Sequence, residues 1–175
     1  MSKRTGRTSK VVPKAGSSQR GVRSDRKPPV AAKTAKLKEP TVCDRCGAVF
    51  MGRTWRRDHP VTHIALTRSD WATCPACEQS RNQIAYGRIL FKGIYVREHE
   101  DAIRRRIGNV AARAEYTQPQ RRVISATWEG NDFEVLTTSQ KLAHRIVTEI
   151  KKAFGGTTTY SWSGKDGSLF ATWRR

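Results

Sequence analysis

A chain of 175 residues can form one or two small domains, but not a large enzyme with a broad core. The hydrophobic content of 37% is low, and a net charge of +19 with a pI of about 10.7 favours a polyanionic partner, most often nucleic acid. An anionic membrane surface would also attract such a chain. However, the sequence contains neither an apolar run of about 18 residues that could span a bilayer nor the apolar segment of a secretory signal. We therefore expect a cytoplasmic protein.

The N-terminal segment 1–38 carries much of the charge. It holds 12 Lys and Arg residues and one acid, Asp25, for a net charge of +11. Leu37 is its only Leu, Ile or aromatic residue, so the segment cannot bury enough apolar surface to offset the entropy of ordering. We expect a disordered basic arm that binds RNA phosphates, with a solubilising tail as the alternative. A transit peptide is disfavoured because the segment has no apolar helical face.

The four cysteines form two C-x2-C pairs, Cys43/Cys46 and Cys74/Cys77, separated by 27 residues. Two such pairs, each in a tight turn, are typical of the two knuckles of a zinc ribbon. Four thiolates close the coordination shell, so we expect a structural Zn²⁺ that does not activate water. Iron and a redox dithiol are the alternatives. A redox pair would need a helix start in a thioredoxin-like βαβ context, which the sequence does not indicate.

A basic and aromatic cluster lies between the two cysteine pairs. After a short strand expected at 48–50, the chain carries Arg53, Trp55, Arg56 and Arg57. Arginines beside an exposed tryptophan suit phosphate contact and base stacking, so we predict a nucleic-acid-binding loop here. The alternative for Trp55 is packing on the small zinc core.

Two histidine-containing patterns could carry metal chemistry. His59 and His63 are four residues apart, but Pro60 lies between them and prevents a shared helical face, so we do not expect them to be ligands. A zinc deaminase would need His-x-Glu ahead of Pro-Cys-x-x-Cys, whereas His99 and Glu100 are adjacent and follow the cysteines. No catalytic motif is recognisable, and we expect a protein that is not an enzyme.

The segment after the second cysteine pair alternates apolar residues over 84–96, which predicts one or two short strands that close the ribbon. Acids at the start and an apolar stripe then predict a helix over 98–113. This helix carries Arg104, Arg105 and Arg106, which we interpret as an RNA-facing surface or as a solvated helix face.

The C-terminal segment from residue 121 reads as a ββαββ unit. A strand, the turn Gly130-Asn131 and a return strand precede an amphipathic helix that ends at Gly155-Gly156. Thr157–Trp162 and Ser168–Trp173 predict a second hairpin. The expected result is a four-stranded antiparallel sheet with one helix across a face.

The predicted protein is therefore of the α+β class, with three parts. We expect the disordered basic arm over 1–38, a four-cysteine zinc-ribbon domain with its following helix over 39–118, and the ββαββ domain over 119–175.

Residues 41–175 resemble the N-terminal half of the large-ribosomal-subunit export adaptors, the nonsense-mediated-decay-associated family of eukaryotes and archaea. The resemblance rests on the paired C-x2-C motifs followed by segments similar to three family patterns: Trp128-Glu129-Gly130-Asn131-Asp132-Phe133, Phe154-Gly155-Gly156 and Phe170-Ala171-Thr172-Trp173. Small bacterial proteins of this layout are closer in length. The adaptors carry further cysteine pairs, later domains and export signals that this chain lacks, so nuclear export is not implied.

The resemblance implies binding to the large ribosomal subunit or its rRNA. Together with the charge, it predicts a non-enzymatic, ribosome-associated RNA-binding zinc protein. The alternative is a DNA-binding transcription regulator that uses the zinc ribbon.

Overall fold

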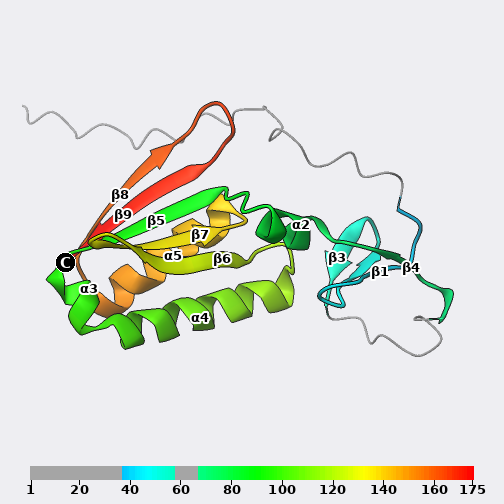
Figure 1. The fold of residues 1–175 in the computed structure, drawn as a ribbon, viewed down its shortest axis with the longest axis horizontal. Coiled ribbons are helices and arrows are strands. Elements are labelled where there is room, and N and C mark those ends of the chain that lie inside the picture. Colours follow the sequence, from blue (N-terminus) through cyan, green and yellow to red (C-terminus); the bar gives the residue numbers. More distant parts are fainter. Residues whose placement is uncertain (1–36, 58–66) are drawn as a thin grey trace, which may run out of the picture.

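The computed structural model describes residues 37–57 and 67–175, which form four helices and two mixed sheets (Figure 1). The predicted arm, apart from its last two residues, lies outside the described residues, as do His59 and His63. None of the helices in the described part of the chain is long and apolar enough to cross a membrane.

The small sheet has the strand order β3-β2-β1-β4, in which β1 and β2 and then β2 and β3 pair antiparallel, while β1 and β4 pair parallel. Its strands are short: β1 (Thr41–Cys43), β2 (Val49–Met51), β3 (Thr54–Arg56) and β4 (Asp70–Ala72). Gly47, with φ +69°, lets the chain turn tightly between β1 and β2. Cys43, the last residue of β1, and Cys46, in the turn that follows, therefore flank a tight turn between strands, as predicted.

The second cysteine pair differs from the predicted knuckle. Cys74 is the N-cap of α2 (Pro75–Arg81), and Pro75 occupies the first turn, where its missing N–H costs no hydrogen bond. Cys77 lies within the same turn of helix and is buried. The expectation of two ribbon knuckles is thus wrong for this pair. A helix starts at this cysteine pair, which the sequence did not indicate.

The large sheet has five strands in the order β6-β7-β5-β9-β8, and only β5 and β9 pair parallel. Its strands are β6 (Val123–Glu129), β7 (Asp132–Thr137), β5 (Gly87–Lys92), β9 (Leu169–Arg174) and β8 (Thr157–Trp162). The predicted four-stranded antiparallel sheet is therefore incomplete. The segment expected to close the ribbon instead supplies β5, which lies between the two C-terminal hairpins and joins them.

Both long helices cover one face of the large sheet, α4 (Glu100–Thr117) and α5 (Gln140–Phe154) (Figure 1). A short helix, α3 (Ile94–Glu98), leads into α4. The apolar stripe predicted for α4 is buried with that of α5, and the strands contribute Phe91 and Trp173 at 0% exposure. β5 and α4 thus belong to the core of the large sheet, although the predicted boundary at 118/119 groups them with the cysteine-containing part.

Candidate metal centre and adjacent cleft

The four cysteine sulfurs converge on one point. All four Sγ atoms lie within 4.8 Å of one another, with 3.9 Å between Cys43 and Cys77 and 3.7 Å between Cys46 and Cys74. A tetrahedral shell with Zn–S bonds of about 2.3 Å has S–S edges of roughly 3.8 Å. The cluster therefore fits a tetrahedral metal ion, as the cysteine spacing predicted.

The backbone around the cluster holds the sulfurs in place. The amide of Cys43 donates to the Ala48 carbonyl at 2.7 Å, and the amide of Gly47 donates to the Cys43 carbonyl at 3.0 Å, which closes the first turn. The Cys74 amide, at the start of α2, donates to the Cys43 sulfur at 3.3 Å. A redox dithiol needs only the pair at the helix start, whereas here both pairs meet, which favours metal binding.

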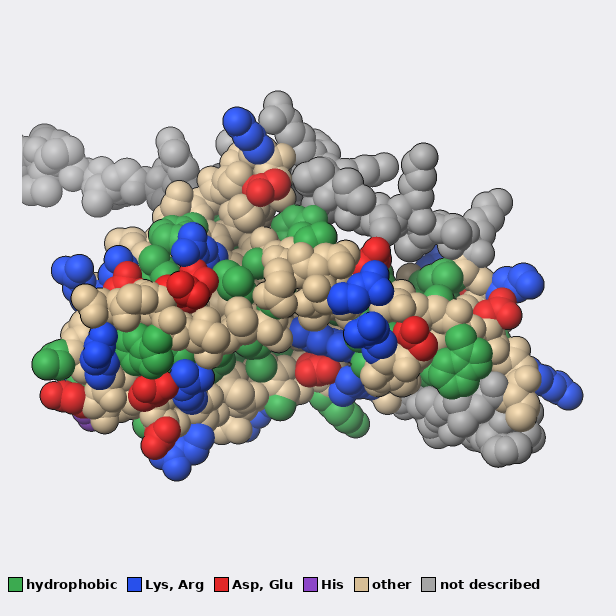
Figure 2. Space-filling view, viewed as in Figure 1, with side chains coloured by type: hydrophobic (Ala, Val, Ile, Leu, Met, Phe, Trp, Pro, Cys, Tyr) green, Lys and Arg blue, Asp and Glu red, His purple; other side chains and the backbone are tan. Residues whose placement is uncertain are grey.

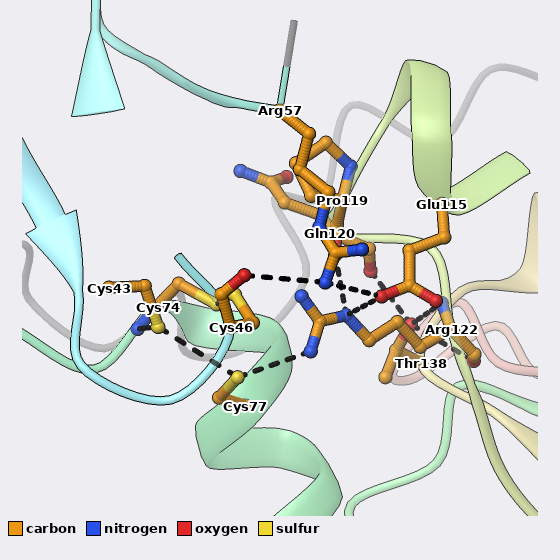
Figure 3. A network of polar contacts seen from close by, with 10 residues as sticks. All are labelled: Cys43, Cys46, Arg57, Cys74, Cys77, Glu115, Pro119, Gln120, Arg122 and Thr138. Atoms are coloured by element: carbon orange, nitrogen blue, oxygen red, sulfur yellow. Dashed lines mark hydrogen bonds and ion pairs between the residues drawn. The ribbon is translucent and has the colours of Figure 1, made fainter. Parts of the chain in front are cut away.

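Arg122 places a positive charge against the sulfurs (Figure 3). Its Nη1 donates to the Cys77 sulfur at 3.2 Å, and its side chain is only 13% exposed. Burial opposes ionisation of the Cys46 thiol, but hydrogen bonds from Arg122 and from the Ala48 amide outweigh burial and lower the pKa of Cys46 to about 6. Burial raises the pKa of Cys74 and of Cys77. Metal binding would therefore release protons from the latter two.

Arg122 also joins the cysteine cluster to the large sheet. Its Nε lies 2.8 Å from the Pro119 carbonyl and 3.3 Å from the Glu115 carboxylate on α4. The same carboxylate pairs with Arg57 at 2.9 Å, and Arg57 reaches the Cys46 carbonyl at 3.5 Å. Figure 2 shows Lys and Arg side chains at this junction, with acidic side chains among them. The ion pairs of Glu115 with Arg57 and Arg122 therefore connect the cysteine-containing part to α4 and the large sheet.

Of the four side chains predicted to bind nucleic acid in this loop, one is buried, one is in an ion pair and two are exposed. Trp55 is 4% exposed and packs in the cysteine-containing core, with its ring 5.4 Å from Phe50, so it offers no free face to a base. Arg57 is held by Glu115. Arg53 and Arg56 remain exposed at the tip and end of the hairpin. The packing alternative for Trp55 is therefore correct, and stacking by this ring is not.

Of the three arginines on α4 interpreted as an RNA-facing surface or a solvated face, two form ion pairs and one is exposed. Arg104 pairs with Glu100 at 2.6 Å and lies 4.4 Å from the centre of the Phe133 ring, and Arg106 pairs with Glu149 at 2.7 Å. Arg105 is exposed. This half of α4 lies away from the small sheet (Figure 1), so the two predicted arginine groups do not form one surface.

His99 lies between α3 and α4, and Glu100 is the first residue of α4; in Figure 1 this end of α4 lies at the opposite end of the molecule from β1. The His99 ring stacks on Tyr95 with 3.8 Å between centroids. Glu100 is held by Arg104. The structure therefore does not bring the two residues of the deaminase pattern to the cluster.

A cleft of about 640 Å³ opens beside the cluster, between β3, the start of α2, the connection from α4 to β6 and the start of α5. Three cations line it, Arg56, Arg121 and Lys141, and no Asp or Glu is among its described lining residues. None of the three forms an ion pair within the described part of the chain. Sequence reasoning missed Arg121 and Lys141 because they lie in different segments and no local pattern joins them.

Comparison of the chain with known protein families, curated proteins and solved structures gave no match.

Proposed function

We propose that this protein is a non-enzymatic zinc protein that binds RNA, with the rRNA of the large ribosomal subunit as its expected target. The observation that carries the proposal is the cleft beside the cysteine cluster, which Arg56, Arg121 and Lys141 line and to which the described residues contribute no acid. Unpaired cations in a concave site attract phosphate groups. The start of α5 at the same cleft adds the positive end of a helix dipole.

The four cysteines would hold the Zn²⁺, and its chemistry is structural. An ion with four thiolate ligands has no position left for water or substrate, so it cross-links the small sheet to α2. Apart from the cysteines, the core of the small sheet and α2 contains only a few apolar side chains among the described residues, such as Trp55. In this proposal the metal keeps Arg56, on β3, in position beside Arg121.

The net charge of +19 favours a polyanionic partner, and the resemblance of residues 41–175 to the large-subunit export adaptors favours RNA among the polyanions. The basic arm would add phosphate contacts of its own, which raise affinity without selecting a sequence.

The test is a salt series of RNA binding, measured by fluorescence anisotropy with labelled rRNA fragments and the full zinc-loaded chain. Log affinity should fall with log salt, with a slope of about −0.7 per phosphate contacted on single strands. Arg56→Ala and Arg121→Ala should each lower the affinity and reduce the slope by about 0.7.

Arg105→Ala is the matched control, since Arg105 is an exposed arginine outside the cleft. The proposal predicts a smaller loss for this variant. A flat salt response would exclude phosphate-driven binding. Equal losses in all three variants would exclude the cleft as the site, and tighter binding to duplex DNA than to RNA would favour the transcription-regulator alternative.

A further inference from the structure

Two aromatic rings are exposed on the edge strand of the large sheet. Tyr160 is 37% exposed and Trp162 is 54% exposed, both on β8, which among the described strands pairs only with β9. Their partners across the ladder, Ala171 and Leu169, are buried in the core that the helices cover. Because directly paired residues point to the same face of a sheet, both rings lie on the side of α5.

A polar and basic row of α5 runs alongside these rings. Lys141, His144, Thr148 and Lys151 follow one another at helical spacing and share one side of the helix. The His144 ring lies 5.1 Å from the Tyr160 ring, which shows that this row faces β8. The aromatic rings and the lysines therefore border the same strip of surface.

The acids near this strip are engaged elsewhere. Glu149, the acid of α5, accepts from Arg106 at 2.7 Å and from Lys152 at 3.1 Å, on the side of the helix that faces α4. Asp166, in the β8–β9 turn, accepts from the amide and the hydroxyl of Ser168 at 3.0 and 2.8 Å. No acid in the described ranges forms an ion pair with Lys141 or Lys151, so their positive charge is available along the row.

The strip continues from the cleft. The four adjacent strands β7, β5, β9 and β8 are paired at one end of the sheet through Thr137, Gly87, Leu169 and Trp162, respectively. α5 begins at this end, three residues after Thr137, and Lys141 in its first turn also lines the cleft. A strand of nucleic acid leaving the cleft past Lys141 therefore meets Trp162 first and Tyr160 next.

We infer that β8 and α5 form a stacking platform for unpaired RNA bases, with Trp162 and Tyr160 as the stacking rings and Lys141 and Lys151 as phosphate contacts. The inference rests on the proposed RNA-binding function and adds to it a base-contacting surface and a preference for single strands. The two rings are two residues apart on a strand, or about 7 Å. Aromatic rings beside unpaired cations bind single strands with little dependence on sequence.

The test uses the full zinc-loaded chain and three probes: a short single-stranded adenosine RNA, an RNA duplex, and inorganic polyphosphate as a charge-only ligand. Trp162→Ala and Tyr160→Ala should each weaken binding of the single strand by about tenfold. Both variants should bind polyphosphate as the wild type does. Trp162→Phe, which keeps a ring, should retain most of the affinity.

Trp71→Ala is the matched control, because Trp71 is 57% exposed but lies on β4 of the small sheet. Its single-strand affinity should equal that of the wild type, and the thermal midpoints of all variants should agree. If the wild type binds RNA but Trp162→Ala and Tyr160→Ala bind it equally well, the platform is refuted and the RNA-binding function stands.

Two further results would also overturn the platform. Equal losses of RNA and polyphosphate binding would show that the rings do not stack on bases. Unchanged RNA binding together with loss of a protein partner would make the strip a protein-docking surface. A wild-type chain that binds neither RNA nor polyphosphate would refute the proposed function itself.

Discussion

Replacing Arg122 with alanine removes the guanidinium that lies against the sulfurs of the candidate metal centre. The side chain is 13% exposed, donates to the Cys77 sulfur at 3.2 Å and lies 3.3 Å from Glu115. A divalent ion with four thiolate ligands carries two net negative charges, and Arg122 offsets part of them. In the variant, no Arg122 guanidinium offsets the negative charge of the thiolate site or of the Glu115 carboxylate.

The size of the effect follows from the geometry. Two unit charges 3.2 Å apart attract by about 5 kcal/mol at an effective dielectric constant of about 20. Desolvation of a nearly buried guanidinium cancels much of this, and hydrogen bonds to charged groups contribute a net 1.5–3 kcal/mol or so. We expect a loss of about 2 kcal/mol, or about 30-fold in zinc affinity. This lies within the roughly 10–100-fold effect typical of residues that contact metal ligands.

The assay is zinc competition with a chromophoric chelator under reducing conditions, together with urea denaturation of the zinc-loaded protein. Arg57→Ala is the matched control, because Arg57 shares the Glu115 carboxylate but does not touch a sulfur, and its side chain is 35% exposed. An exposed ion pair contributes about 0–1 kcal/mol, so this variant should keep nearly wild-type zinc affinity. Arg122→Lys keeps the charge without the planar donor geometry and should be intermediate.

Two results would refute this reasoning. Wild-type zinc affinity in Arg122→Ala would mean that the contact with the thiolate contributes nothing to the metal site. An equal loss in Arg57→Ala would mean that the effect passes through Glu115 and the junction, not through the sulfurs.

Two further predictions concern the two cores. Removing the metal with a chelator should speed amide exchange in β1–β4 and α2 but leave the large sheet protected, since their buried clusters are separate; uniform loss of protection would contradict this. Gly87→Ala should lower the free energy of unfolding by about 1–3 kcal/mol, because a Cβ there would lie 2.5 Å from that of Ala143. Gly108→Ala, with no atom within 4 Å at an exposed helical position, should instead stabilise by about 1 kcal/mol, and urea denaturation compares the two.

Features that depend on neighbouring residues were predictable from the sequence. The C-x2-C spacing predicted that all four sulfurs could meet, and they do. The apolar periodicity of α4 and α5 placed both helices to within a few residues, and Gly155 ends α5 where the sequence indicated. The helical signals and each single C-x2-C pair lie within a turn or a few turns of the chain, where local geometry alone relates the residues, and the ligand chemistry of a metal ion relates one pair to the other.

Features that depend on distant partners were decided only by the tertiary structure. Gly87 pairs with Thr137 on one side and Leu169 on the other, so the place of β5 depends on strands about 50 and 80 residues away. A hydrophobic period shows that a strand has a buried face, but not which strands it will pair with.

The same reason applies to the site. Nothing local distinguishes Arg122, which contacts a sulfur, from Arg121, which lines the cleft. Nor does local sequence tell that Trp55 is buried while Trp162 is exposed beside α5. The sequence by itself determined the four cysteines that could hold a metal ion and the excess of positive charge. Only the tertiary structure decided which charges are paired and which have no partner among the described residues, because pairing and burial are set by contacts between segments far apart in the chain.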